Sequence, residues 1–251
     1  MAGAFANKVG IVTGAGSGIG EAIAHELARE GATVIVADLD PDAIRRVTDA
    51  ILGAGGSAHA FEVDVSDADA VKRMVEYAVE KGGGLHLAVN NAGIGGPSVP
   101  TGEYDPDAWR HVIDVNLHGV FYGMKYQIAA MLESGGGAIV NMSSILGSVG
   151  FANASAYVAS KHAVNGLTKT AAMEYATQNI RVNAVGPAFI DTPLLSKNLD
   201  EDVIGQLADL HPIARLGRSE EVSALTCFLL SDRASFITGS YHLVDGGYTT
   251  R

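Results

Sequence analysis

The segment KVGIVTGAGSGIG, residues 8–20, joins a short apolar strand over 8–13 to a glycine-rich turn, and a helical pattern over 19–30 follows it. A strand that leads through glycines into a helix N-terminus forms an anion site, because free backbone N–H groups and the helix dipole point at a phosphate. Glycine allows the sharp turn and the close approach to a pyrophosphate. An ordinary flexible loop is the alternative. We predict a dinucleotide-binding turn built on Gly14, Gly18 and Gly20, with Ser17 and Ile19 between them.

A second apolar strand, over 33–38, ends in Asp38, eighteen residues after Gly20. An acid at this position accepts hydrogen bonds from the ribose hydroxyls of the adenosine half of the cofactor. The alternative role is a helix cap before Pro41, and both roles can apply to the pair Asp38 and Asp40. We expect Asp38 to hold the ribose.

The same carboxylate predicts NAD rather than NADP. A 2′-phosphate would lie near Asp38, and partial exposure reduces a repulsion of about 4 kcal/mol at 4 Å to about 1–3 kcal/mol. The positions where a cation would help, Ser17 and Leu39, are neutral. Arg45 and Arg46, further along the next helix, are expected to face solvent.

The remaining chain alternates apolar strands with helical patterns and shows no linker or repeat. Nearly continuous apolar strands suit a parallel sheet that is covered on both faces. We therefore predict an α/β fold, one doubly wound parallel sheet (Rossmann fold) in a single domain over 1–251, with its ligand crevice at the carboxyl ends of the strands. Strands are expected at 8–13, 33–38, 57–63, 86–90, 138–143, 180–185 and 241–244, and helices at 19–30, 41–53, 67–81, 105–133, 154–178, 193–210 and 219–230.

Tyr157 and Lys161 lie four residues apart in the predicted helix over 154–178. That spacing puts both side chains on one helix face, about 5–6 Å apart at Cβ. A phenol has a pKa of about 10, and a Lys ammonium roughly 4 Å away is expected to lower it by about three units. We predict a Tyr poised for acid–base catalysis, with Ser144 meeting it at the end of a strand. A solvated helix surface is the alternative.

Taken together, these motifs resemble the short-chain dehydrogenase/reductases of roughly 250 residues, and the resemblance covers essentially the whole chain. It implies an NAD(H)-dependent oxidoreductase that interconverts a secondary alcohol and a ketone by hydride transfer. One departure is visible, because Pro187 is followed by Ala188 where the family commonly has glycine. The motifs occur in family order: Thr13-Gly14-x-x-x-Gly18-x-Gly20, Asp64-Val65, Asn90-Asn91-Ala92-Gly93, Asn116, Ser144, Tyr157-x-x-x-Lys161 and Asn183-Ala184-Val185-x-Pro187.

The resemblance also implies the site residues. Tyr157 is the expected general acid/base, Ser144 holds the carbonyl oxygen, Lys161 fixes the ribose, and Asn116 holds a helix kink and a water that joins Lys161 to solvent. Each of three residues also has an alternative role. Asn116 can be a polar core residue that is hydrogen-bonded by its neighbours. Asp64 can be a helix cap, and Thr192 can be only a turn residue. The implied cofactor contacts are Gly14, Ser17, Gly18, Ile19, Gly20, Asp38, Leu39, Asp64, Val65, Asn91, Ala92, Gly93, Tyr157, Lys161, Pro187, Ile190 and Thr192.

The expected substrate pocket is mostly apolar, which favours a hydrophobic or modest-sized ketone or secondary alcohol over a sugar. The segment 190–217, rich in leucine with acidic interruptions, is expected to act as a lid beside this pocket. The candidate pocket residues are Ile94, Gly95, Gly96, Ser144, Ile145, Leu146, Phe151, Asn153, Tyr157, Ala188, Phe189, Leu194 and Leu195.

Composition narrows the function classes. The hydrophobic content of 47% with 18% charged residues describes a globular core. A net charge of −11 argues against nucleic-acid or anionic-membrane binding. The eight histidines are scattered, so we expect no catalytic metal, and Cys227, the only cysteine, is expected to be inert core. Without a signal-peptide pattern or a long apolar run, the chain is expected to be cytoplasmic.

Self-association is a further expectation. The predicted helices over 105–133 and 154–178 carry more apolar surface than one sheet face can cover, as Ala171, Ala172 and Met173 illustrate. In the family these helices pair with their copies, and the C-terminal strand region, here ending at Arg251, makes a second interface. We expect a homotetramer. The alternative functions are an NADPH-dependent 3-oxoacyl-type reductase, which Asp38 disfavours, and a non-catalytic dinucleotide-binding regulator, which the complete catalytic set disfavours.

Overall fold

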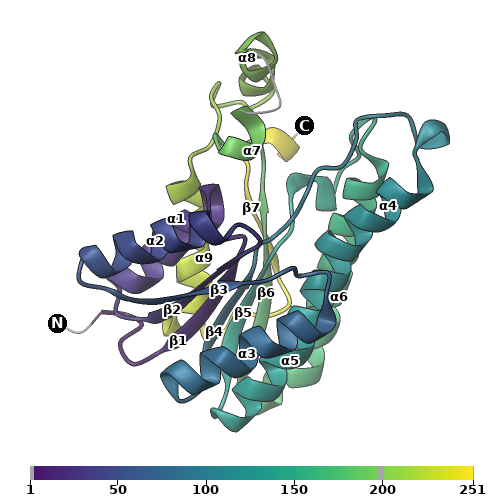
Figure 1. The fold of residues 1–251 in the computed structure, drawn as a ribbon. Coiled ribbons are helices and arrows are strands. Elements are labelled where there is room, and N and C mark those ends of the chain that lie inside the picture. Colours follow the sequence, from purple (N-terminus) through teal and green to yellow (C-terminus); the bar gives the residue numbers. More distant parts are fainter. Residues whose placement is uncertain (1–2, 197–200, 251) are drawn as a thin grey trace.

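A computed structural model describes residues 3–196 and 201–250 of the protein. Seven parallel strands form one sheet in the order β3-β2-β1-β4-β5-β6-β7 (Figure 1). Each predicted strand is found within two residues of its expected bounds, which confirms the doubly wound α/β fold. The strands are β1 (Val9–Thr13), β2 (Thr33–Asp38), β3 (Ser57–Glu62), β4 (Leu87–Asn90), β5 (Gly137–Met142), β6 (Ile180–Pro187) and β7 (Tyr241–Val244).

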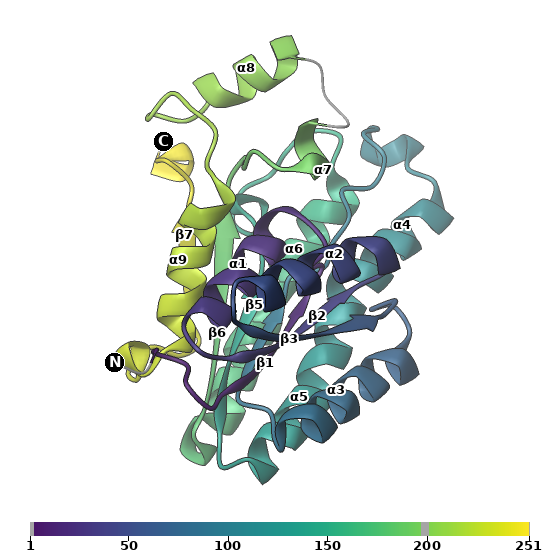
Figure 2. The same cartoon turned by 60° about the vertical axis from the view of Figure 1, so that its left-hand side comes forward.

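Helices cover both faces of this sheet (Figures 1 and 2). On one face α1 (Gly18–Arg29) packs against α9 (Ser219–Leu230), with α2 (Pro41–Gly53) beside them. On the other face α3 (Ala68–Gly82) packs against α5 (Gly119–Glu133), and α6 (Ser155–Tyr175) runs alongside. Two apolar clusters fill the space between sheet and helices. One contains Ile23, Leu27 and Val222, and the other contains Met74 and Met131.

The predicted helix over 105–133 is not continuous. It consists of α4 (Pro106–Ile113), a π-helical turn (Asp114–His118) and α5. Asn116 lies inside that turn. Its Oδ1 accepts from the N–H of Ile94 at 2.8 Å, and its Nδ2 donates to the carbonyl of Ile94 at 2.9 Å. A wide turn of this kind is a common feature of functional sites in helices. The α-helix is therefore interrupted by a π turn at Asn116, the position where the resemblance implied a kink.

Two other predicted helices also differ in their ends. The one over 154–178 is α6 followed by a 3₁₀ turn, Ala176–Gln178. The one over 193–210 appears as α7 (Pro193–Ser196) and α8 (Glu201–Asp209), and residues 197–200 between them lie outside the described part of the chain. Both helices stand beyond the carboxyl ends of the strands (Figures 1 and 2). Within the described ranges, no helix has both the length and the apolar character needed to cross a membrane.

The strand order reverses at β1. This strand pairs with β2 on one side and with β4 on the other. After β1 the chain crosses to β2, and after β4 it crosses in the opposite direction, to β5. Such a switch point opens a crevice at the sheet edge where ligands bind in doubly wound folds.

Candidate active site

A cavity of about 690 Å³ lies at this edge of the sheet. Of the predicted site residues, Gly20 and Asn116 lie behind its wall, and Leu194, on α7, has a side chain outside the described part of the structure. All the other predicted site residues line it: Gly14, Ser17, Gly18, Ile19, Asp38, Leu39, Asp64, Val65, Asn91, Ala92, Gly93, Ile94, Gly95, Gly96, Ser144, Ile145, Leu146, Phe151, Asn153, Tyr157, Lys161, Pro187, Ala188, Phe189, Ile190, Thr192 and Leu195.

The glycine turn requires its glycines. Gly14 and Gly18 have φ angles of 63° and 55°, in the left-handed region that side chains disfavour. A Cβ on Gly20 would lie 2.1 Å from the carbonyl oxygen of Gly14, so α1 can begin this close to the turn only with glycine there. The amide of Asn91 fixes the turn by donating to the carbonyls of Thr13 at 3.0 Å and Gly14 at 3.2 Å. Asn91, predicted as a cofactor contact, therefore braces the turn in this structure.

Asp38 lies beside the same turn at the carboxyl end of β2. Its Oδ2 accepts from the N–H of Gly16 at 2.9 Å, and its Oδ1 accepts from Leu39 N at 2.7 Å and Asp40 N at 3.2 Å. Asp40 accepts from Asp42 N and Ala43 N and caps α2. The capping role therefore belongs to Asp40, and Asp38 faces the cavity.

The turn, the cavity and the carboxylate fit a dinucleotide cofactor. Free N–H groups at the start of α1 suit a pyrophosphate, and a side chain at Gly14 or Gly18 would meet Ala92 or Thr192 across the crevice. Asp64 also lines this half of the cavity. Asp67, which accepts from Asp69 N and Ala70 N, caps α3, so Asp64 is not the helix cap.

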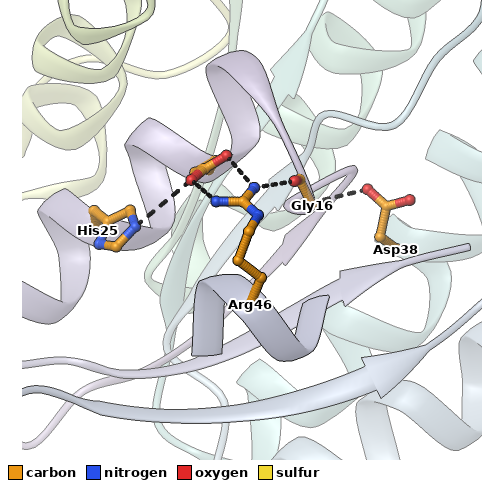
Figure 3. Close-up of polar contacts among 5 residues, drawn as sticks. Gly16, His25, Asp38 and Arg46 are labelled. Atoms are coloured by element: carbon orange, nitrogen blue, oxygen red, sulfur yellow. Dashed lines mark hydrogen bonds and ion pairs between the residues drawn. The ribbon is translucent and has the colours of Figure 1, made fainter. Parts of the chain in front are cut away.

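Both arginines of α2 are exposed, as the sequence predicts, but they have different partners. Arg45 is exposed and pairs with Asp42 at 3.3 Å, as expected of a solvent-facing residue. Arg46 is also exposed, and in addition it reaches the glycine turn, where its Nη2 donates to the carbonyl of Gly16 at 2.8 Å (Figure 3). The same guanidinium pairs with Glu21 at the start of α1. Adjacent residues on a helix point in different directions, so Arg46 reaches the turn and Arg45 does not. The sequence alone did not show which of the two would do so.

Tyr157, Lys161 and Ser144 meet at the other half of the cavity. Both Tyr157 and Lys161 come from α6, and the Lys161 nitrogen lies 5.4 Å from the centre of the Tyr157 ring. Lys161 Nζ donates to the carbonyl of Met142, at the end of β5, at 2.8 Å. A Cβ on Gly93 would lie 3.2 Å from Asn116 Oδ1 and 3.6 Å from Lys161 Nζ, so Gly93 leaves room where these two polar groups converge.

The predicted lowering of the Tyr157 pKa by Lys161 is wrong for this structure. Burial raises the pKa of the Tyr157 phenol, although its hydrogen bond with Ser144 acts in the opposite direction. Burial also lowers the pKa of Lys161 from 10.5 to about 8. The desolvation of the buried phenolate outweighs the attraction that the sequence spacing predicted.

Aromatic side chains gather at one end of the cavity. The ring centres of Phe151 and Phe189 are 6.0 Å apart, and Phe189 lies 5.8 Å from Tyr248. Asn153, on the loop before α6, has a φ of 64°, which asparagine tolerates better than most residues. Ala188 has no positive φ and donates its N–H to Val244 O at 3.1 Å, so the departure from glycine introduces no backbone strain.

Some residues at the site carry no motif. His111 and Val115 line the cavity and precede Asn116 on α4 and the π turn, so helical spacing from Asn116 was the available signal. Tyr241, on β7, donates its hydroxyl to the carbonyl of Ser144 at 2.5 Å across 97 residues, and no local pattern indicates it. Among the described residues, no group of three or more His, Cys, Asp or Glu side chains gathers that could hold a metal ion.

The chain is similar to known proteins over nearly its whole length. A family model described as enoyl-(acyl carrier protein) reductase matches residues 14–249. Cyclohexanol dehydrogenase of Acinetobacter sp. (strain SE19) is 49% identical over 100% of this chain and 98% of its own length. Cis-4-hydroxycyclohexanecarboxylate dehydrogenase of Sinomonas cyclohexanicum is 47% identical over 99% of each chain. The crystal structure of levodione reductase superposes with a TM-score of 0.94 at 34% identity, over 98% of this chain and 99% of that one.

The protein belongs to the short-chain dehydrogenase/reductase family. It is therefore an oxidoreductase, and the cofactors of its family are nicotinamide dinucleotides. The resemblance stated from the sequence motifs is confirmed.

Proposed function

We propose that the protein is an NAD(H)-dependent dehydrogenase that interconverts a cyclic secondary alcohol and the corresponding ketone. The observation that carries this proposal is the convergence of Tyr157, Ser144 and Lys161 on one wall of a cavity whose other end is aromatic. Two relatives that match over nearly the whole chain are named for alcohols on a six-membered ring, which supports the substrate class.

The adenosine half of the cofactor is assigned to the glycine turn and to Asp38, with the adenine beside Asp64 and Val65. Asp38 accepts from Gly16 N through one carboxylate oxygen and faces the cavity, so a ribose hydroxyl can donate to it. The nicotinamide half is assigned to the Lys161 end, with Ile190 and Thr192 over the turn. When bound, the nicotinamide ring supplies or accepts the hydride.

The protein's own side chains handle the proton. Tyr157 donates the proton from its hydroxyl to the substrate oxygen during reduction, and it takes the proton back during oxidation. Ser144 hydrogen-bonds the same oxygen. Because burial raises the pKa of Tyr157, the phenol stays protonated at neutral pH and is suited to the reductive direction. Oxidation is favoured as pH rises.

Lys161 and Asn116 are assigned to proton delivery behind Tyr157. Lys161 is almost fully buried, and its pKa of about 8 makes proton loss accessible near neutral pH. Asn116 Oδ1 lies on the same side of Gly93 as the lysine nitrogen. We assign Lys161 a second role, holding the nicotinamide ribose.

The substrate is assigned to the apolar end of the cavity. Ile145 and Leu146 are buried under it, and Phe151 and Phe189 form its wall. An apolar aromatic wall suits an alicyclic ring without charged substituents. Residues 1–251 would act as one domain, and the segment 190–217, which is joined at its base by the bridge between Ile190 and Gly217, would act as the lid.

The protein would act as a homotetramer. Phe121, Leu132 and Met173 are exposed on α5 and α6, and Phe236 is exposed before β7. Ala171 and Ala172, which were expected to add to this surface, are instead buried inside the subunit. The apolar face is therefore smaller than the sequence predicted, but it lies on the predicted helices.

The test is a substrate screen in which NADH consumption is followed at neutral pH with cyclic and acyclic ketones, and NADH formation at alkaline pH with the matching alcohols. Cyclohexanone should turn over with a higher kcat/KM than an acyclic ketone of the same carbon number. Tyr157→Phe should lower kcat by at least about 100-fold while the Kd for NADH changes little. A variant that kept a tenth of the wild-type rate would refute the proton-donor role.

A further inference from the structure

Arg46 is a cation held next to the place where NAD and NADP differ. Its Nη2 donates to the carbonyl of Gly16, and the N–H of the same glycine donates to Asp38 (Figure 3). Bond lengths within one glycine then limit the separation of Asp38 Oδ2 and Arg46 Nη2 to about 10 Å. An arginine side chain that pivots on its flexible stem can cover that distance to a phosphate beside Asp38.

Glu21 forms an ion pair with Arg46. Its two carboxylate oxygens lie 2.6 Å from Nη1 and 2.7 Å from Nη2 of Arg46, which is the bidentate geometry of a strong charge-assisted pair. Ser17, Asp38 and Leu39 line the cavity and Arg46 does not, so in this structure the guanidinium binds Gly16 and Glu21 outside the cavity lining. His25 Nε2 lies 3.9 Å from Glu21 on the far side of the pair.

We propose that the Glu21–Arg46 pair is a second determinant of cofactor choice, which withholds Arg46 from the 2′-phosphate of NADP and uses it to hold the glycine turn for NAD. This inference rests on the proposed function, because it assumes that the protein prefers NAD to NADP. Asp38 repels the phosphate directly, whereas Glu21 acts through the arginine that it neutralises. Arg46 also ties α2 to the turn, and Gly16 itself packs so tightly that a Cβ would lie 2.8 Å from Ala43.

The chain offers a matched control on the same helix. Arg45 pairs with Asp42 at 3.3 Å, and both side chains are largely exposed. Neither residue lines the cavity or contacts the glycine turn. Asp42→Asn therefore removes one carboxylate and frees one arginine, as Glu21→Gln does, without freeing a cation at Gly16.

The experiment is fluorescence titration of the purified protein with NADH and with NADPH, which needs no turnover. Glu21→Gln should tighten NADPH binding by about 3- to 10-fold, because a released guanidinium can pair with phosphate. Adding Arg46→Gln to that variant should abolish the gain, and Asp42→Asn should change neither Kd by more than about 1.5-fold. Raising the salt concentration should shrink the gain, since the contact is exposed.

Two results would overturn the inference. One is an unchanged Kd for NADPH in Glu21→Gln, and the other is a gain that survives in the Glu21→Gln, Arg46→Gln double variant. Failure of the proposed cofactor preference would appear elsewhere, as equal affinities for NADH and NADPH in the unmodified protein. The response of NADPH binding to Glu21→Gln decides the role of the pair in either case.

Discussion

The buried charge of Lys161 gives a prediction about stability that can be measured without substrate or cofactor. The side chain is 3% exposed and its pKa falls from 10.5 to about 8 because burial disfavours the charged form. Above pH 8 the folded protein releases this proton, while the unfolded chain keeps it up to about pH 10.5. The unfolded state then binds more protons, so the contribution of Lys161 to stability rises with pH between about 8 and 10.5.

The size of this effect follows from the pKa shift. At pH 9.5 the folded state is about 1.5 pH units above the pKa of Lys161, which corresponds to about 2 kcal/mol. The measurement is urea unfolding of the wild type and Lys161→Met at pH 7, 8, 9 and 9.5, at one fixed protein concentration because any self-association shifts the apparent stability. The free energy of unfolding of the wild type, minus that of the variant, should increase by about 2 kcal/mol from pH 7 to pH 9.5.

Only the change with pH tests the reasoning. The substitution also removes the hydrogen bond to Met142 O, and that loss shifts the difference equally at every pH. Lys169→Met is the matched control, because Lys169 is an exposed lysine on the same helix α6 and its substitution removes no buried charge. A difference for Lys161→Met that changed by less than about 0.5 kcal/mol over this range would show that the buried lysine does not titrate as inferred.

Three other outcomes are expected. Gly20→Ala should raise the Kd for NADH by at least about tenfold, because its methyl would lie 2.1 Å from the Gly14 carbonyl and displace the turn. Tyr241→Phe should lower kcat several-fold with a smaller change in KM and alter the pH profile of kcat, because the Ser144 carbonyl loses its hydrogen bond and the Tyr157 phenol loses a polar neighbour. Light scattering should show a tetramer at micromolar concentration, and Met173→Lys, on the exposed face of α6, should weaken it.

Each of these outcomes has a control or a contrary result. Gly53→Ala adds a methyl at the end of α2 with nothing within 4 Å, so NADH binding should be unchanged. Tyr104→Phe removes a buried hydroxyl for which the described residues provide no hydrogen-bond partner, so kcat should stay near the wild-type value. Equal effects of the two tyrosine substitutions would assign Tyr241 a packing role only. A stable monomer in light scattering would contradict the tetramer.

The sequence alone determined the features that depend on neighbouring residues. The apolar runs and the glycine spacing placed β1, the turn and α1 correctly, because a strand, a tight turn and a helix N-terminus are local requirements of the backbone. Parallel strands also place the motif residues that follow them at one edge of the sheet. For this reason Asp38, Ser144 and Tyr157 could be assigned to one crevice from their order in the chain.

The tertiary structure decided what depends on contacts between distant segments. The π turn at Asp114–His118 forms where Asn116 bonds the backbone of Ile94, 22 residues away. The helical periodicity of the sequence cannot predict a contact between residues so far apart. Whether the pKa of Tyr157 is raised or lowered depends on how completely the packed side chains exclude water from the phenol. The spacing between Tyr157 and Lys161 carries no information about that burial. The positions of Arg46 on Gly16 and of the Tyr241 hydroxyl on Ser144 also follow only from folding, because those pairs are 30 and 97 residues apart and each depends on how a separate element packs against the site.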